Sequence, residues 1–251
     1  MGSYEPVVAL MRGLEVLRYL NEQGTMSVGQ IHEQTGIAKP TVVRILETLM
    51  HAGYVQQNAA DRRYGVTARV LSLSNGYDAQ SRLMKIASPI LDAYRQKVGW
   101  PIELAVFDTD AMVILDTSRK SGYLAVNRKP GSRVPVLRTA LGRAYLAALA
   151  EPERAEVLAR LRALPGDDFK LARQPADWAA LVGRASERHY AIADMETLSN
   201  GRALASAILF ESRPVASVNI VVHAAVMSLA DFERDFGPVI RSIADEITLA
   251  L

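Results

Sequence analysis

The stretch from Ser27 to Tyr64 constrains the fold of this chain most, because capping residues mark the ends of two short helices within it. Ser27 and Gln30 form a capping-box pattern, in which a hydroxyl and an amide satisfy backbone donors at a helix start. Gly36 suits the left-handed conformation that ends a helix. Pro40 suits the first turn of the next helix, where its missing N–H group costs nothing. The sequence therefore predicts two helices joined by a tight turn.

The second of these helices has one apolar face, and two short strands follow it. Apolar residues that repeat at i, i+3, i+4 and i+7 pack against a core, and here they are Val42, Ile45, Leu46 and Leu49. After Gly53, the runs 54–57 and 63–66 alternate around a polar turn, which predicts a β-hairpin. This order of elements has the shape of a winged helix-turn-helix, so DNA binding is the first hypothesis.

The opposite face of the second helix and the hairpin turn carry groups that can meet DNA. In the major groove an Arg side chain can bind a guanine edge with two hydrogen bonds, and Thr or Val can contact a thymine methyl group. An Arg in the hairpin turn can reach a phosphate or a narrow minor groove. The predicted DNA-contacting residues are Lys39, Pro40, Thr41, Val43, Arg44, Thr48, Arg62 and Arg63.

Bulk charge does not single out nucleic acid as the partner. Six acidic residues balance six basic residues between positions 1 and 66, and only the stretch 39–63 has a local excess, with four bases against two acids. Winged helices also serve as protein-interaction modules, and that reading stays open. Any sequence specificity must therefore depend on a few side chains.

Composition and length place the chain among ordinary globular proteins of two modest domains. It has 251 residues, of which 49% are hydrophobic and 22% charged. It has no cysteine, which excludes disulfide scaffolds, thiolate zinc sites and cysteine nucleophiles. No apolar run approaches the roughly 20 residues that cross a bilayer, and the start lacks the pattern of an export signal. We expect a cytoplasmic protein without membrane contact.

The hydrophobic pattern divides the chain into a winged helix-turn-helix domain (1–66), a connecting helix (67–82) and a larger domain (83–251). A first helix is expected over 8–22 and one after the connecting helix over 83–97. Beyond Trp100, strands and helices mix without regular βαβ alternation, so the fold class is α+β with a mixed or antiparallel sheet. The expected strands are 102–107, 112–117, 123–126, 203–210 and 215–222, and the expected helices are 139–150, 152–164, 177–189 and 229–251.

The larger domain lacks the sequence signatures of common catalytic sites. It has no Gly-x-Ser-x-Gly elbow, Walker loop or Gly-x-Gly-x-x-Gly run, and no two of the four histidines have metal-ligand spacing. We therefore expect no metal and no cofactor. The acid pairs Asp167-Asp168 and Asp194-x-Glu196 motivate an alternative, a small-molecule enzyme that uses the winged helix only to dimerise. The simplest role for a domain that lacks catalytic signatures and is joined to a DNA-binding domain is to bind a small-molecule signal.

Several segments resemble the IclR-type (isocitrate lyase regulator) family of bacterial transcriptional regulators, over nearly the whole chain. The motifs are Arg12-Gly13-Leu14, the run 35–49 with Thr-Gly-Ile-Ala-Lys-Pro-Thr-Val, Ala52-Gly53-Tyr54-Val55, Gly131-Ser132-Arg133-Val134-Pro135 and Thr139-Ala140-Leu141-Gly142-Arg143-Ala144. The resemblance implies a GAF-like effector-binding domain and an inducer bound in its pocket. It also implies homodimers paired through the reader domains and connecting helices, often homotetramers, on a palindromic DNA site.

Within that family, the chain is most similar in kind to regulators of hydroxyphenylpropionate degradation, which are commonly activators that respond to aromatic acids. It departs from the family where Arg143 replaces the usual Lys, Ala203 the usual Cys, and Met195 interrupts an acidic run. An apolar pocket with a few convergent polar groups suits a small aromatic carboxylic acid, and Arg138 could add a charge-assisted hydrogen bond. The pocket that the resemblance implies is lined by Tyr123, Val134, Leu137, Thr139, Ala140, Leu141, Asp194, Ala203, Asn219 and Val221.

Overall fold

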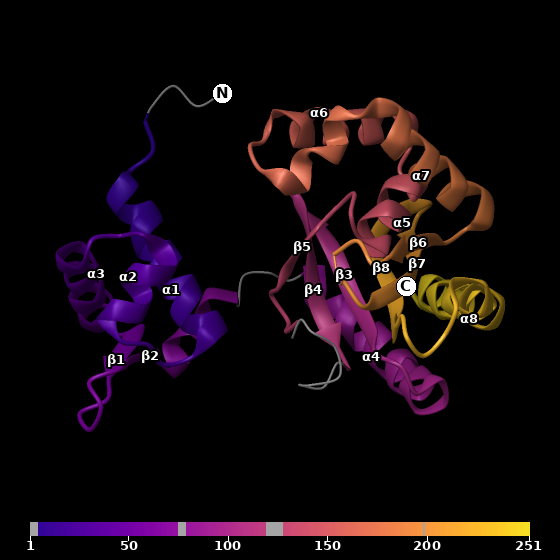
Figure 1. Ribbon diagram of the computed structural model, residues 1–251. Helices are drawn as coiled ribbons and strands as arrows, with labels where there is room; N and C mark the ends of the chain where they lie inside the picture. The colour runs from indigo at the N-terminus through magenta and orange to yellow at the C-terminus, as the bar shows by residue number, and fades with distance from the viewer. Residues whose placement is uncertain (1–4, 75–78, 119–127, 198) are drawn as a thin grey trace. The chain divides into compact units, whose positions relative to one another are not determined.

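The computed structural model describes residues 5–74, 79–118, 128–197 and 199–251, and the chain divides into two compact units, 1–78 and 79–251 (Figure 1). The N-terminal unit contains three helices and a two-stranded antiparallel sheet. Its elements are α1 (Val8–Gln23), α2 (Val28–Thr35), α3 (Lys39–His51), β1 (Val55–Gln57) and β2 (Tyr64–Val66). This is a helix-turn-helix followed by a hairpin, so the predicted N-terminal fold is confirmed.

The residues that were predicted to cap the helices do so in the structure. The Ser27 hydroxyl accepts a hydrogen bond from the Gln30 N–H at 3.3 Å, and the Gln30 side-chain oxygen accepts one from the Ser27 N–H at 3.0 Å. Gly36 ends α2 with a φ of 68°, and Pro40 lies in the first turn of α3. The three helices then bury one apolar cluster, whose fully buried members are Val16, Leu20, Ile31, Val42 and Leu46.

The segment after the hairpin differs from the connecting helix expected over 67–82. Its described part forms a 3₁₀ helix over Ala68–Ser74, and α4 (Ala79–Val98) starts after it.

The C-terminal unit is built on a six-stranded sheet in the order β5-β4-β3-β8-β7-β6, in which every neighbouring pair is antiparallel. The prediction of an α+β fold is confirmed. Four strands match the expected runs, the short strands β5 and β6 were not predicted, and the strand expected over 123–126 lies outside the described residues. The strands are β3 (Ile102–Asp108), β4 (Ala111–Thr117), β5 (Arg133–Pro135), β6 (Ala191–Asp194), β7 (Gly201–Phe210) and β8 (Arg213–His223).

Helices cover both faces of this sheet (Figure 1). Successive strand residues point to opposite faces, so Leu104 packs in one apolar cluster with α4 and α8 (Leu229–Ala250), whereas Ala105 packs in another with α5 (Ala140–Ala148). Outside α5 lie α6 (Glu151–Ala163), two 3₁₀ turns (Asp167–Phe169 and Leu171–Arg173) and α7 (Pro175–Arg188). None of the described helices is both long and apolar enough to cross a membrane.

Helix α5 starts in close contact with the segment before it. A Cβ atom built on Gly142 would lie 2.1 Å from the carbonyl oxygen of Val136, so only glycine fits between the two backbones. Thr139 caps this helix, because its hydroxyl accepts a hydrogen bond from the Gly142 N–H at 3.2 Å and donates one to the Pro135 carbonyl at 2.7 Å. The N-terminus of α5 is thereby fixed against the sheet.

Candidate functional site

Helix α3 turns one face to the core of the N-terminal unit and the other to solvent. Val42 and Leu46 are fully buried, whereas Lys39, Pro40 and Arg44 are exposed. Thr48 is also exposed, and Thr41 and Val43 are half-buried at the margin of the same face. Among the described residues, the side chains of Lys39 and Arg44 form no hydrogen bond or ion pair. Both are therefore available to a partner.

The turn that positions α3 is held by side chains that the sequence analysis did not single out. The Thr35 hydroxyl donates to the Ile31 carbonyl at 2.7 Å and accepts from the Ile37 N–H at 3.2 Å. The Nδ1 atom of His32 lies 2.8 Å from the carbonyl oxygen of Ile37. A threonine directly before a capping glycine, with a histidine one helical turn before it, is the signal that could have predicted these contacts.

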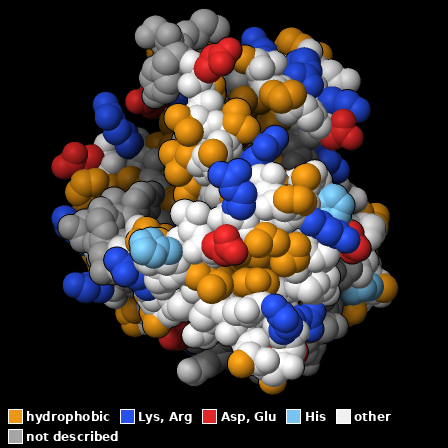
Figure 2. All heavy atoms as spheres, turned by 90° about the vertical axis from the view of Figure 1, so that its left-hand side faces the viewer, with side chains coloured by type: hydrophobic (Ala, Val, Ile, Leu, Met, Phe, Trp, Pro, Cys, Tyr) orange, Lys and Arg blue, Asp and Glu red, His pale blue; other side chains and the backbone are white. Residues whose placement is uncertain are grey.

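The two hairpin arginines differ in what they contact. Arg62 is exposed at the turn with a φ of 56°, and its side chain has no partner among the described residues. Arg63 is half-buried and donates to the Gln30 side-chain oxygen at 2.8 Å, so it ties the hairpin to α2. Figure 2 shows a face on which Lys and Arg side chains are interspersed with apolar and acidic ones. The basic residues on this face are therefore separate side chains and do not form one continuous positively charged surface.

Helix α1 exposes an apolar strip on the side away from its buried residues. Its large side chains there are 55–61% exposed, which is unusual for a contiguous set on a folded surface and indicates a partner. We refer to this set as the α1 strip, and it consists of Val8, Leu10, Met11 and Leu14.

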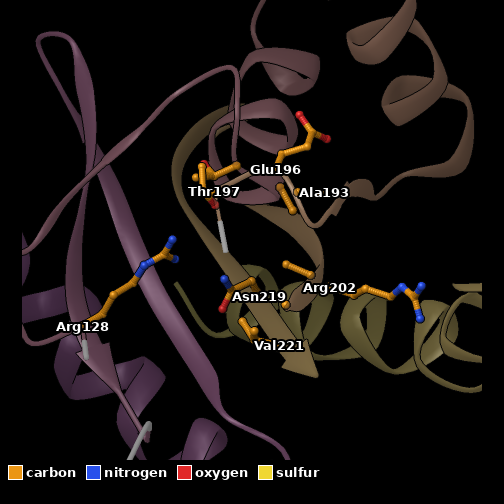
Figure 3. Close-up of a pocket in the computed structure, with 11 residues that line it drawn as sticks. Arg128, Ala193, Glu196, Thr197, Arg202, Asn219 and Val221 are labelled. Carbon is orange, nitrogen blue, oxygen red and sulfur yellow. The ribbon is translucent and has the colours of Figure 1, made fainter. Parts of the chain in front are cut away.

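In the C-terminal unit, a small open recess with a cavity volume of about 10 Å³ lies beside the start of α5, next to β6, β7 and β8 (Figure 3). Five residues predicted for the effector pocket line it, namely Thr139, Ala140, Ala203, Asn219 and Val221. The sequence analysis did not select the other lining residues for the pocket. They are Arg128, Ala193, Glu196, Thr197, Gly201 and Arg202.

The other residues predicted for the pocket have different surroundings. Val134, Leu137 and Leu141 are buried in apolar clusters. Arg138 donates to the backbone carbonyl of Glu196 at 2.7 Å. Tyr123 lies outside the described residues.

Asp194 borders a neighbouring cleft rather than the recess. Its carboxylate accepts a hydrogen bond from the Arg202 Nε–H at 2.7 Å. That cleft has a cavity volume of about 260 Å³ and is lined mainly by residues of α7, β6 and α8. Arg202 also donates to the carbonyls of Ala224 and Met227, so its guanidinium points away from the recess (Figure 3).

An ion pair between buried Arg143 and half-buried Glu196 fixes the wall between the recess and this cleft. Arg143 is only 2% exposed, and it donates to the carbonyls of Leu137 at 2.7 Å and Ile192 at 2.6 Å. It also binds both carboxylate oxygens of Glu196, one of them at 2.7 Å. Bidentate pairing of this kind is among the stronger hydrogen-bonded arrangements in proteins. Glu196 is thereby held in the wall of both cavities.

A second buried charged cluster lies on the other side of the recess. The carboxylate of Glu103, which is fully buried on β3, accepts hydrogen bonds from Arg128 Nη1 at 3.2 Å and Asn219 Nδ2 at 3.1 Å. The Asn219 side-chain oxygen accepts from the backbone N–H of Glu103 at 3.1 Å. A single glutamate inside the apolar strand run 102–107 is the sequence signal that could have predicted this cluster.

Three of the acids that motivated an enzyme each form an ion pair with a different basic residue. Asp167 is exposed and pairs with Lys170 at 2.8 Å, whereas Asp194 pairs with Arg202 and Glu196 with Arg143. The side chain of Asp168 lies outside the described residues. Paired carboxylates of this kind are structural groups more often than catalytic ones.

Two family models match the chain. The IclR helix-turn-helix domain matches residues 9–59, and the model described as the bacterial transcriptional regulator IclR C-terminal matches residues 77–249. The two matches fall on the two compact units.

Individual relatives match over nearly their full length. The HTH-type transcriptional regulator TsaQ1/TsaQ2 of Comamonas testosteroni is 29% identical over 247 residues, covering 96% of this chain and 87% of that protein. The crystal structure of an IclR family transcriptional regulator from Brucella abortus has a TM-score of 0.72 at 26% identity, covering 100% of this chain and 96% of that one. An IclR homolog from Microbacterium hydrocarbonoxydans, crystallised with 4-hydroxybenzoate, shares the fold with a TM-score of 0.72 at 20% identity, covering 97% and 98%.

Proposed function

The chain belongs to the IclR family of bacterial transcriptional regulators, and from this premise we propose that it controls an operon for the degradation of an aromatic compound. Members of this family bind DNA through the N-terminal domain and a small molecule through the C-terminal domain, and they are regulators rather than enzymes. In our proposal, α3 and the β1–β2 turn read the operator, and an aromatic carboxylic acid binds in the recess beside α5.

The observation that carries the DNA-reading part is the solvent-facing side of α3. Lys39 and Arg44 project from a helix whose opposite face is buried, and their side chains have no partner among the described residues. A recognition helix in the major groove needs this combination. We assign base contacts to Thr41, Val43 and Arg44, and backbone contacts to Lys39, Pro40, Thr48, Arg62 and Arg63.

The aromatic acid is supported by the chemistry of the recess. Its wall combines small apolar side chains, such as Ala140, Ala203 and Val221, with polar groups from Thr139 and Asn219. Apolar walls with a few convergent polar groups bind small organic ligands, and the first turn of a helix attracts a carboxylate. The Microbacterium protein of the same fold was crystallised with 4-hydroxybenzoate.

The α1 strip supports a homodimer, in which the N-terminal units of two chains pack against each other. Its apolar side chains are more than half exposed, so pairing would remove them from water. Two recognition helices related by a twofold axis require a palindromic operator. A shift of the C-terminal unit on effector binding would then change the spacing of those helices.

DNA binding by single-residue variants tests the assignment of roles. Arg44→Ala should weaken binding to the selected operator by about 1–3 kcal/mol and relax its sequence preference. Arg62→Ala should weaken binding to all sequences about equally and reduce the salt dependence. The measurement is a fluorescence-anisotropy titration over a series of salt concentrations, with operator and scrambled DNA. Equal, sequence-independent losses for both variants would contradict the assigned roles.

Thermal unfolding in the presence of candidate acids tests the effector class. A ligand at 100 times its dissociation constant stabilises the folded state by about 2.7 kcal/mol. Benzoates and phenylpropionates should raise the melting temperature, whereas short keto acids should not. If only keto acids raised the melting temperature, the effector would be an aliphatic acid and not an aromatic one.

A further inference from the structure

We propose that Arg128 binds the carboxylate of the effector, and that Glu103 is a built-in counter-charge that limits the affinity of this arginine for anions. The inference rests on the proposed function, because it takes an acid to occupy the recess. Nothing in the family motifs singles out either residue, since Arg128 precedes the Gly131 segment and Glu103 lies inside a strand.

Arg128 has N–H donors that no other described residue accepts from. It is 7% exposed, and its one hydrogen bond to the described residues joins Nη1 to the Glu103 carboxylate at 3.2 Å. A guanidinium carries five N–H donors. Figure 3 shows the Arg128 side chain reaching toward the space in front of Asn219. A carboxylate placed there can accept two parallel hydrogen bonds from one guanidinium, which is the geometry that arginine favours.

The other arginines around the recess are engaged elsewhere. Arg138 donates to the Glu196 carbonyl, and Arg143 donates to two carbonyls and to the Glu196 carboxylate. Arg202 pairs with Asp194 and points away from the recess (Figure 3). Among the described residues, Arg128 is thus the cation that combines a position in the lining with free donors.

Asn219 and Thr117 hold the Glu103 carboxylate beside Arg128, and the Thr117 hydroxyl donates to it at 3.4 Å. The Asn219 amide donates to the Glu103 carboxylate, and its oxygen accepts from the Glu103 backbone N–H. An entering carboxylate therefore meets an arginine whose charge is already balanced by a fixed, fully buried anion. A like charge at this distance opposes the second anion. Removal of Arg128 and removal of the Glu103 charge should therefore change the affinity for acids in opposite directions.

The test compares 4-hydroxybenzoate with its uncharged analogue 4-hydroxybenzamide, by calorimetric titration of the full-length protein. Arg128→Gln should lower the affinity for 4-hydroxybenzoate by about 10- to 100-fold, the range of a hydrogen bond to a charged group. Glu103→Gln, which keeps the side-chain shape, should raise that affinity by about tenfold. Both variants should bind 4-hydroxybenzamide within about threefold of the wild type, because an amide carries no charge for either residue to attract or repel.

Two further variants control for folding and for a general loss of positive charge. The double variant Arg128→Gln/Glu103→Gln removes both charges together, which costs a folded protein less than leaving one buried charge unpaired. It should fold, and it should bind the acid more tightly than Arg128→Gln but more weakly than Glu103→Gln, because it lacks both the attracting and the repelling charge. Arg133→Gln removes an arginine on the neighbouring strand that is 44% exposed and should leave the affinity unchanged.

Three outcomes would overturn the inference. One is an unchanged affinity for the acid in Arg128→Gln, and another is a loss of acid affinity in Glu103→Gln. A parallel loss of acid and amide in both variants would show that the cluster only shapes the recess. In each case the wild type still binds the acid, so the proposed effector class survives. If the wild type binds no benzoate or phenylpropionate at all, the effector class fails and the inference fails with it.

Discussion

In the N-terminal unit the proposed DNA-contacting side chains project into solvent, whereas in the C-terminal unit the polar side chains around the recess are buried. Arg44 is exposed on a helix whose core residues Val42 and Leu46 are fully buried. Arg143 and Glu103, by contrast, are 2% and 0% exposed and hydrogen-bonded to their surroundings.

The two arrangements couple function to stability differently. A solvent-facing side chain can be removed without leaving a buried group unpaired, so the fold tolerates its loss. A buried charged side chain leaves its former partners without hydrogen bonds when it is removed, and that loss is large. We therefore expect DNA affinity to change independently of stability in the first unit, whereas effector binding and stability should change together in the second.

The largest effect is expected for Arg143→Ala. The variant leaves the Glu196 carboxylate and the carbonyls of Leu137 and Ile192 without a donor, so the C-terminal unit should lose about 3–5 kcal/mol of stability. Urea unfolding followed by tryptophan fluorescence measures this unit selectively, because both tryptophans, Trp100 and Trp178, lie in it.

The matched control is Arg44→Ala, which deletes an exposed arginine in the other unit. It should change stability by no more than about 0.5 kcal/mol while it weakens operator binding. A stability loss in Arg44→Ala as large as in Arg143→Ala would contradict the contrast between the two units.

Gly142→Ala should cost the C-terminal unit about 1–3 kcal/mol, as overpacking does. The added methyl group would meet the Val136 backbone, which cannot rotate aside as a side chain can. The same substitution at Gly183 in α7 meets nothing within 4 Å, so it should stabilise the protein by about 0.5–1 kcal/mol through helix propensity. The changes in unfolding free energy of the two variants are measured by tryptophan fluorescence. Changes of opposite sign would support the close approach at α5, and changes of the same sign would refute it.

The sequence predicted those parts of the fold that are determined by interactions between residues close together in the chain. The capping box at Ser27 and the left-handed Gly36 act within a few residues, and the turn between β3 and β4 has Thr109 with a φ of 59°. Strand β6 was missed because its four residues pair only with β7, so their conformation depends on tertiary contacts. Short edge strands of this kind lack a periodic pattern of their own.

The site around the recess was harder to predict, because its contacts join distant parts of the chain. Arg138 was predicted to add a charge-assisted hydrogen bond to the effector, yet its side chain meets the carbonyl of Glu196, 58 positions further along. Arg128 depends on Glu103, 25 positions before it. Direction and pairing of such side chains are set by packing, which a periodic pattern does not report.

In the N-terminal unit, Ser27→Ala should cost about 1 kcal/mol, because it removes the hydroxyl that caps α2. Ser27→Asn keeps a capping oxygen and should cost much less. Circular dichroism at the helical band measures the loss, since this unit has no tryptophan. Operator affinity should fall little in either variant, because α3 keeps its own core contacts. A large loss of affinity in Ser27→Ala would show that stability and DNA reading are coupled in this unit as well.

The smallest effect is expected from a surface ion pair in the C-terminal unit. This pair tests whether the loss of stability depends on the burial of a charged side chain or on the unit in which it lies. The hydrogen bond from Arg133 lowers the pKa of Asp108, and both side chains are more than 40% exposed. Because the folded-state pKa is lowered, the stabilisation is present above the ordinary aspartate value of about 4 and disappears as the pH falls through the lowered value. Solvent screening keeps it below about 0.5 kcal/mol. The difference in thermal stability between Arg133→Gln and the wild type should therefore be small at pH 7 and shrink as the pH is lowered below about 4. A difference of several kcal/mol at pH 7 would mean that the whole C-terminal unit, rather than its buried groups, is sensitive to loss of charge.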